Sequence, residues 1–211
     1  MRLYRYISPI LLLILVVGIS LNSDSYTVEA SGGNYYMNSA ISSFDNFVFV
    51  PEETETVDID INATNYKIVK TAFKEIGNVG GEKYWKWAGF NRWAAWCCCF
   101  ASWCADQNGF IDSNVVPKFT SVAEGIRLFK NRNEWMSKSE IPAPGMIIFF
   151  DLIDEENNFV RDGRADHVGI VAGVKDGYIY CIEGNYRNTC QETRYEIGCR
   201  NIYGYGTPNY K

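Results

Sequence analysis

The sequence predicts an α+β fold in which N-terminal helices pack on an antiparallel β-sheet. Between residues 65 and 132, apolar residues recur at helical spacing. After "PAPG" at 142–145 the pattern changes to short apolar runs typical of strands: "MIIFF", "DHVGIVAGV", "YIYCIEGN" and a last one near "CRNIYGY". A block of helices followed by a block of strands favours this class over a parallel sheet, whose strands and helices alternate along the chain.

The composition fits one globular domain with additional segments, because the chain has 211 residues of which 47% are hydrophobic. The formal net charge is -5, and the isoelectric point is near 5.0. The sequence has no run rich in Lys and Arg, and binding to a phosphate backbone requires a basic surface. We therefore expect no nucleic-acid partner.

Residues 1–30 are predicted to be a signal peptide or an N-terminal membrane anchor. Arg2 and Arg5 precede an apolar run at 10–19, which is short for a membrane span and fits the core of a secretory signal. The "VEA" at 28–30 is an acceptable cleavage site but lies far from this run, so cleavage and retention both stay open. We expect a secreted or extracytoplasmic protein, anchored in the membrane at the cell wall if the segment is retained.

Residues 31–64 are predicted to be an acidic, flexible spacer. The stretch 31–66 has no Lys or Arg, and its first half is crowded with Ser, Asn and Gly. Its second half is acidic, and "NFVFV" between the two halves has the pattern of a short strand. Residues 65–211 then form the folded domain.

The domain is predicted to open with a helix over "NYKIVKTAFKEIG", at 65–77. Its apolar residues, from Ile68 to Ile76, recur at helical spacing, and Gly77 is the expected stop. The glycine-rich "GNVGGEKYW" that follows is predicted to be a loop.

Two further helices are predicted before the strands. From 93 to 105 only Ser102 is polar, which is typical of a helix that is buried on every side. In "TSVAEGIRLFKNR", Thr120 or Ser121 is the expected N-cap, and Glu124 completes a capping box.

Four of the seven cysteines lie in the predicted buried helix, three of them consecutive. Consecutive helical residues point about 100° apart, so Cys97, Cys98 and Cys99 cannot all face one centre. A zinc site normally takes thiolates from spaced positions. We therefore predict no metal and no cofactor, and interpret Cys98, Cys99 and Cys104 as small core residues.

Disulfides are permitted in an exported protein, and an odd number of cysteines leaves at least one thiol unpaired. Cys181, Cys190 and Cys199 recur at regular spacing, so two of them are candidates for a bridge. The sequence does not fix the connectivity among these and the helical cysteines.

A cysteine at the start of a buried helix is chemically distinctive, because the unpaired N–H groups and the helix dipole stabilise a thiolate. Such a thiolate can attack a carbonyl carbon, and the same N–H groups can hold the resulting oxyanion. The reaction needs a base, and the only histidine of the chain is His167.

The turn at "KDG" decides which residues share a face with His167. A two-residue turn at 176–177 would place Glu183 opposite Ile170, on the other face of the ribbon from the histidine. The polar residues of "EGN" would then have no role beside the imidazole.

A three-residue loop at 175–177 shifts the pairing by one residue. His167 then faces Asn185, and Gly169 faces Glu183 and leaves room above the strand. We predict this second register, because both polar residues share the histidine's face and the other face becomes a coherent apolar surface. The result is a cysteine, a histidine and an orienting carboxylate or amide, as in a papain-like triad.

The spaced set "WCCCFASWCADQNG", "PAPGMIIFF", "DHVGIV" and "YCIEGN" resembles the CHAP domain, a branch of the papain-like NlpC-type cysteine hydrolases. The resemblance covers about 65–210 and implies a papain-like fold. In the family's W-C-x-x-F-x-S-W-C pattern the nucleophile is the first cysteine, which matches Cys97. The base matches His167, the third member Glu183 and a supporting amide Asn185.

The chain departs from the pattern of this family in two respects. Cys98 and Cys99 stand where the family usually has small residues, and Met146 stands where an Asp commonly follows the "PG" turn. Neither change removes a member of the expected triad.

The resemblance implies an exported peptidoglycan hydrolase, an N-acetylmuramoyl-L-alanine amidase or an endopeptidase of the stem or cross-bridge, with peptidoglycan as its partner. Two alternatives remain open. One is another acyl transfer on the same triad, such as transpeptidation or a transglutaminase-like exchange. The other is a non-catalytic wall-binding domain whose thiols are all bridged or buried.

Overall fold

The computed structural model describes residues 26–30, 33–37, 63–152 and 161–210. Strands β1 (Tyr26–Ala30) and β2 (Gly33–Met37) pair in antiparallel fashion where the predicted export segment meets the predicted spacer. The apolar run near the N-terminus and "NFVFV" lie outside the described residues. Among the helices that the structure describes, none combines the length and the apolar character that a bilayer crossing requires.

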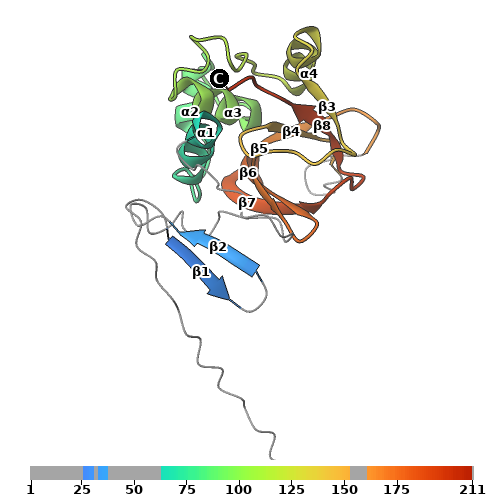
Figure 1. Cartoon of the computed structure of the whole chain (residues 1–211). Coiled ribbons are helices and arrows are strands. Elements are labelled where there is room, and N and C mark those ends of the chain that lie inside the picture. The colour runs from blue at the N-terminus through green and yellow to red at the C-terminus, as the bar shows by residue number, and fades with distance from the viewer. Residues whose placement is uncertain (1–25, 31–32, 38–62, 153–160, 211) are drawn as a thin grey trace, which may run out of the picture.

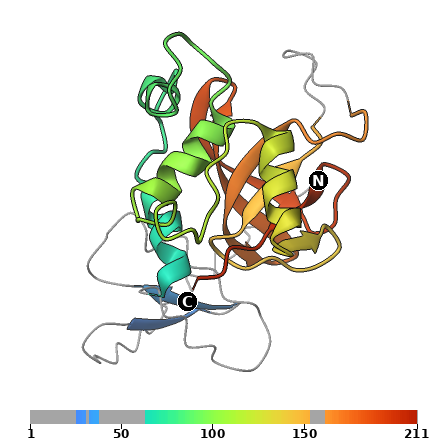
Figure 2. The same ribbon diagram turned by 90° about the horizontal axis from the view of Figure 1, so that it is seen from above.

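Four helices form the first half of the domain. Helices α1 to α3 lie together beside strands β5 and β6, whereas α4 lies at the β3–β8 end of the sheet (Figures 1 and 2). Their bounds are α1 Thr64–Phe73, α2 Glu82–Trp87, α3 Cys97–Asp106 and α4 Val122–Asn131.

Six antiparallel strands form the second half, in the order β3-β8-β4-β5-β6-β7. The predicted α+β class, with helices packed on an antiparallel sheet, is confirmed. The strands are β3 Trp135–Ser137, β4 Ile147–Phe150, β5 His167–Lys175, β6 Tyr178–Tyr186, β7 Thr189–Glu196 and β8 Ile202–Gly206.

The helix boundaries differ from the prediction in three places. The first helix was predicted to run to a stop at Gly77, but α1 ends at Phe73. The loop predicted over "GNVGGEKYW" is wrong at its end, because α2 starts at Glu82 after Gly81, whose φ of 58° lies in the left-handed region. The buried helix predicted from residue 93 starts only at Cys97. Trp93, four positions earlier, is 61% exposed.

The capping box of α4 is confirmed, with Ser121 as the N-cap. The Ser121 hydroxyl accepts a hydrogen bond from the N–H of Glu124 at 3.3 Å, and the Glu124 carboxylate accepts one from the N–H of Thr120 at 3.3 Å. The N–H of Glu124, a donor that the helix start would leave without a partner, is thereby satisfied, as is the N–H of Thr120 just before the N-cap.

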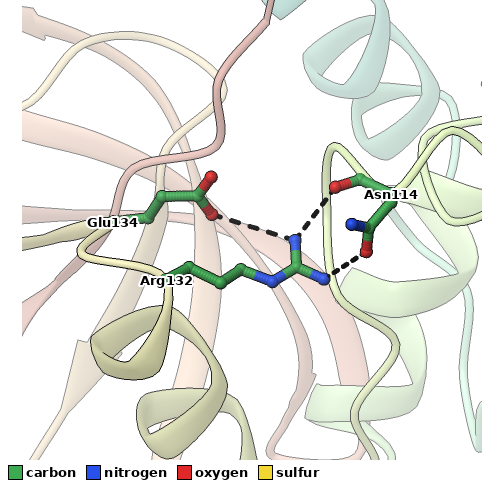
Figure 3. A network of polar contacts seen from close by, with 3 residues as sticks. All are labelled: Asn114, Arg132 and Glu134. Carbon is green, nitrogen blue, oxygen red and sulfur yellow. Dashed lines mark hydrogen bonds and ion pairs between the residues drawn. The ribbon is translucent and has the colours of Figure 1, made fainter.

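The other end of α4 is tied to the loop that follows α3. Arg132 donates through Nη1 to the backbone oxygen of Asn114 at 3.0 Å, and its Nη2 bonds the Asn114 side chain (Figure 3). Glu134 approaches the same guanidinium at 3.9 Å. This network holds α4 and the start of β3 against the helical half.

Apolar side chains cover both faces of the sheet. Val168, Ile170 and Ile182 pack against α3 in the larger core. Val171 and Cys181 belong to a second core on the opposite side of the same strands, together with residues of β4 and β8. The face that a residue of β5 or β6 occupies therefore decides whether it points towards the helices or away from them.

Candidate active site

Cys97 is the first residue of α3, as the prediction requires. The N-cap position is Trp96, whose side chain makes no capping hydrogen bond to the helix. The first N–H groups of α3 therefore have no side-chain acceptor from the N-cap, and this end of the helix favours an anionic group.

Trp96 fixes the position of this helix start. Its buried ring stacks on Tyr84 at 5.2 Å and meets Phe100 edge-on, and its Nε1 donates to the Asn188 side chain at 3.3 Å. Gly184 of β6 lies directly against the same rings, since a Cβ there would come within 2.5 Å of the Phe100 Cβ. Cys97, which follows Trp96, is thus held next to β6, the strand that carries Glu183.

His167 is the first residue of β5 and lies opposite Phe150 of β4. Only 3% of its surface is exposed. The imidazole lies between two aromatic rings, Phe150 at 6.1 Å in a tilted contact and Tyr186 at 6.1 Å in an edge contact. Aromatic rings from β4 and β6 thus border the imidazole.

The strand pairing brings Glu183 to the histidine's face, in the predicted register but by a different route. The predicted three-residue loop is wrong, because Lys175 pairs with Tyr178 and leaves Asp176 and Gly177 as a two-residue turn. Both turn residues have positive φ, 50° and 78°, as a tight hairpin turn with matching twist requires.

A β-bulge then restores the predicted register. The pairing shifts between Val171 and Gly173, so that Ala172 is the extra residue and Val171 pairs with Cys181. From there towards the site the pairs are those expected for the shifted register, with Ile170 opposite Ile182. The bulge also moves Val174 to the other face, so the predicted apolar face ends at Ala172.

Glu183 is fully buried and contacts the imidazole directly. Its Oε2 lies 2.9 Å from Nε2 of His167. The contact is a close charge pair and not an aligned hydrogen bond, because neither atom has a hydrogen-bond partner of good geometry. Gly169 provides the space, as predicted: a Cβ there would lie 2.8 Å from the Glu183 Cγ.

The electrostatics of the site favour a thiolate and an imidazolium. A hydrogen bond from the Cys98 side chain is the largest cause of a Cys97 pKa well below the usual value. Burial opposes it, and His167 and the Cys98 N–H lower the pKa further. Burial alone would lower the pKa of His167, but Cys97 and Glu183 outweigh it and raise that pKa to about 10.

The structure does not bring Asn185 to the imidazole as it does Glu183. Asn185 is half-buried, has a φ of 62° and lies where the pairing of β6 with β7 is interrupted. A carboxylate, rather than this amide, is therefore the group beside Nε2.

The other cysteines are free thiols, and no disulfide joins any of the seven. Cys98, Cys99 and Cys104 are buried in the core that the prediction assigned to them. Burial raises the pKa of Cys99 to about 11, so this thiol stays protonated. Within the described ranges, no three His, Cys, Asp or Glu side chains gather as a metal site would need.

Sequence reasoning missed two contacts of the site. Cys98 was expected only to pack, yet its thiol and its backbone N–H both interact with Cys97. Thr193 of β7 donates its hydroxyl to Oε1 of Glu183. The only sign of the Cys98 contact in the sequence is that cysteines stand beside Cys97 where the family usually has small residues. The Thr193 contact depends on β7, a strand that was not predicted.

Two solved structures resemble the fold at low identity, "The crystal structure of Ly7917" and "The crystal structure of Ly7917 with the hydrolyzing product of MDP". They are 17% and 16% identical to this chain, each with a TM-score of 0.44 and 68% of this chain covered. The chain spans 62% of their length. A comparison with curated proteins gave no match.

A family model gives the identification. Residues 85–185 match the model of the CHAP domain, a range that includes Cys97, His167 and Glu183. The chain therefore carries a CHAP domain at residues 85–185.

Proposed function

We propose that this chain is an exported cysteine hydrolase that cleaves an amide bond of peptidoglycan through Cys97, His167 and Glu183. The observation that carries the proposal is the arrangement of these three groups. The thiol of Cys97 at a helix start is hydrogen-bonded to the only imidazole of the chain, and a buried carboxylate lies 2.9 Å from that imidazole's Nε2.

In the first half-reaction the Cys97 thiolate attacks the carbonyl carbon of the scissile amide. The oxygen becomes an oxyanion, which the backbone N–H of Cys97 at the start of α3 binds. The imidazolium of His167 then gives its proton to the amide nitrogen as the C–N bond breaks. The amine leaves, and the acyl group remains on sulfur as a thioester.

In the second half-reaction the now neutral imidazole removes a proton from water. The resulting hydroxide attacks the thioester carbon, the C–S bond breaks and the product leaves as a carboxylic acid. The sulfur departs as a thiolate beside the reprotonated imidazole, which restores the starting state. Throughout, Glu183 holds Nε2 so that the other ring nitrogen faces the sulfur.

An amidase and an endopeptidase share these steps and differ only in which amide bond is cut. An amidase would release a lactyl carboxylate on the glycan and the amine of the first stem residue. An endopeptidase would free an amine within the stem or the cross-bridge. The chemistry of the site serves both, so the bond is assigned by the products.

The test is digestion of purified peptidoglycan by the full chain, wild type against Cys97→Ser, with Cys99→Ala as a matched core variant. We expect wild type and Cys99→Ala to release equal amounts of new amines and carboxylates. Cys97→Ser should lose at least about 10³-fold in rate. Mass spectrometry of the released fragments identifies the bond.

Three outcomes would contradict the proposal. An active Cys97→Ser variant beside an inactive Cys99→Ala variant would place the nucleophile elsewhere. Wild-type protein that binds the wall but releases no new amine or carboxylate would identify a wall-binding domain. Products that carry an added amine in place of water would identify a transpeptidase.

A further inference from the structure

The carboxylate of Glu183 is held from the side opposite the imidazole. Its Oε2 faces His167, and this contact lacks hydrogen-bond alignment. Its Oε1 accepts a hydrogen bond from the hydroxyl of Thr193. A buried carboxylate takes its orientation from such directional donors, because a charge contact alone leaves it free to rotate.

The register of β6 and β7 explains why Thr193 reaches this carboxylate. Gln191 lies opposite Glu183, and Thr193 lies opposite Cys181. Residues opposite one another share a face, so Thr193 is the diagonal neighbour of Glu183 on the histidine's side of the sheet. Its branched side chain has few rotamers, which keeps the hydroxyl in place.

A second hydroxyl lies further along the same face. Tyr195 pairs with Ile179 on β6. Burial raises the pKa of its phenol, and the charge of Glu183 and a side-chain hydrogen bond with Glu183 raise it further. Its ring packs on Phe150 at 4.6 Å, the same ring that lies against His167. Strand β7 thus lines the side of the carboxylate that faces away from the imidazole.

We propose that Thr193 is a positioning residue, whose hydroxyl anchors Oε1 of Glu183 so that Oε2 stays against His167. This inference rests on the proposed function, because it concerns the same three groups. Thr193 lies beyond the range that matches the family model, 85–185. The anchor therefore belongs to the part of this chain that the family pattern leaves undescribed.

Loss of the anchor has a defined chemical effect. A Glu183 carboxylate that turns away no longer stabilises the imidazolium, so the pKa of His167 falls. An imidazole that is less often protonated stabilises the Cys97 thiolate less, so the pKa of Cys97 rises. The pH range in which the ion pair exists then narrows from both sides. The titratable groups that face the pair are Cys98 on α3, Asp166 before β5, Cys181 and Tyr186 on β6, and Tyr195 on β7.

The test compares Thr193→Val, which keeps the shape and removes the hydroxyl, with Thr193→Ser, which keeps the hydroxyl. Thr189→Val is the matched control on the same strand, because the Thr189 hydroxyl bonds only the backbone oxygen of Arg187. Two pH profiles are measured in the full chain. One is kcat/KM on peptidoglycan, and the other is the rate of Cys97 alkylation by iodoacetamide, resolved from the other thiols by mass spectrometry.

We expect Thr193→Val to lower kcat/KM by about ten- to a hundredfold with little change in KM, as the loss of a hydrogen bond to a charged group implies. In both pH profiles the acid limb should move to higher pH and the alkaline limb to lower pH, so that the active range narrows by about one pH unit in total. Thr193→Ser and Thr189→Val should keep the wild-type limbs. The proposal would be overturned if Thr193→Val kept the acid and alkaline limbs of the wild type. It would also be overturned if Thr193→Ser lost as much kcat/KM as Thr193→Val.

The alkylation profile separates this inference from the proposed function, because it needs no substrate. Wild-type protein that does not digest peptidoglycan, but whose Cys97 profile narrows in Thr193→Val, would leave the anchor standing and remove the proposed substrate. If Thr193→Val does not fold, Thr193→Ala is used, since it adds no bulk. Failure of both variants to fold would identify a structural residue and overturn the proposal.

Discussion

His167 and Glu183 form a close pair, Nε2 to Oε2 at 2.9 Å, although the turn between their strands would by itself place them on opposite faces. The two-residue turn sets one register and the bulge at Ala172 changes it by one residue. The bulge thus has a direct consequence for the site. Without the bulge the Glu183 carboxylate would face the helices, and with it the carboxylate lies beside the imidazole of His167.

Glu183→Gln should retain the fold and lose most of the activity. The amide keeps the shape of the side chain but removes the charge that helps to raise the pKa of His167 to about 10. We expect the alkaline limb of the kcat/KM profile to move to lower pH, and the maximum to fall by about 10²-fold.

Glu192→Gln is the control for this change. Glu192 is the neighbouring acid on β7, lies opposite Ile182 and so occupies the other face. Its replacement should leave both limbs in place. An unchanged profile in Glu183→Gln would show that the carboxylate does not act on the imidazole.

Gly169→Ala should damage activity more than stability. The added Cβ would lie 2.8 Å from the Glu183 Cγ, so the carboxylate must shift. We expect a cost of about 1–3 kcal/mol in the free energy of unfolding, as for other overpacked sites, and a fall in kcat with the folded protein still present.

The matched variant is Gly125→Ala in α4. Its Cβ would meet the Phe119 ring at the same 2.8 Å, but Gly125 lies on α4, whereas Gly169 lies on β5 against Glu183. It should lose comparable stability, measured by urea denaturation, and keep its kcat. Equal losses of kcat in the two variants would argue against a specific displacement of Glu183.

Cys98→Ala should shift the acid limb of the activity profile to higher pH. The ion pair forms as the pH rises through the pKa of Cys97 and is lost as it rises through that of His167. Because a hydrogen bond from Cys98 is the largest cause of the low Cys97 pKa, its removal raises that pKa and leaves the alkaline limb near 10. The cavity should cost about 1 kcal/mol.

Cys99→Ala provides the comparison, because Cys99 stays protonated and does not donate to Cys97. Its acid limb should match the wild type. The limbs are read from kcat/KM and from the pH dependence of Cys97 alkylation. An acid limb that moves equally in both variants would assign the shift to packing and not to the hydrogen bond.

The sequence predicted the central helix and four strands because their cores are apolar. It missed β3 and β7, the two edge strands, and "TCQETRYE" of β7 has few apolar residues to mark it. A strand at an edge needs less apolar surface than a central one, so its pattern is weaker. Because β7 was not predicted, the contact between Thr193 and Glu183 was not predicted either.

The expected triad came from the residues, whereas its geometry depended on local backbone features. His167 and Glu183 were placed on one face by choosing the register with the better apolar surface, and that choice was correct near the site. The turn itself was wrong, because a bulge at Ala172 has no clear mark in a run of small apolar residues. The Cys98 contact likewise depends on side-chain directions at a helix start.

Ser121→Ala should destabilise the protein without affecting the chemistry. The variant loses the hydroxyl that accepts from the N–H of Glu124 and leaves that donor to water. We expect a loss of about 1 kcal/mol in the free energy of unfolding, the usual cost of removing an N-cap.

Ser121→Asp should retain the stability, because a carboxylate also caps the helix and interacts favourably with its positive end. Chemical denaturation measures both variants, and kcat/KM should stay at the wild-type value. A loss in Ser121→Asp as large as that in Ser121→Ala would show that packing, and not capping, holds the start of α4.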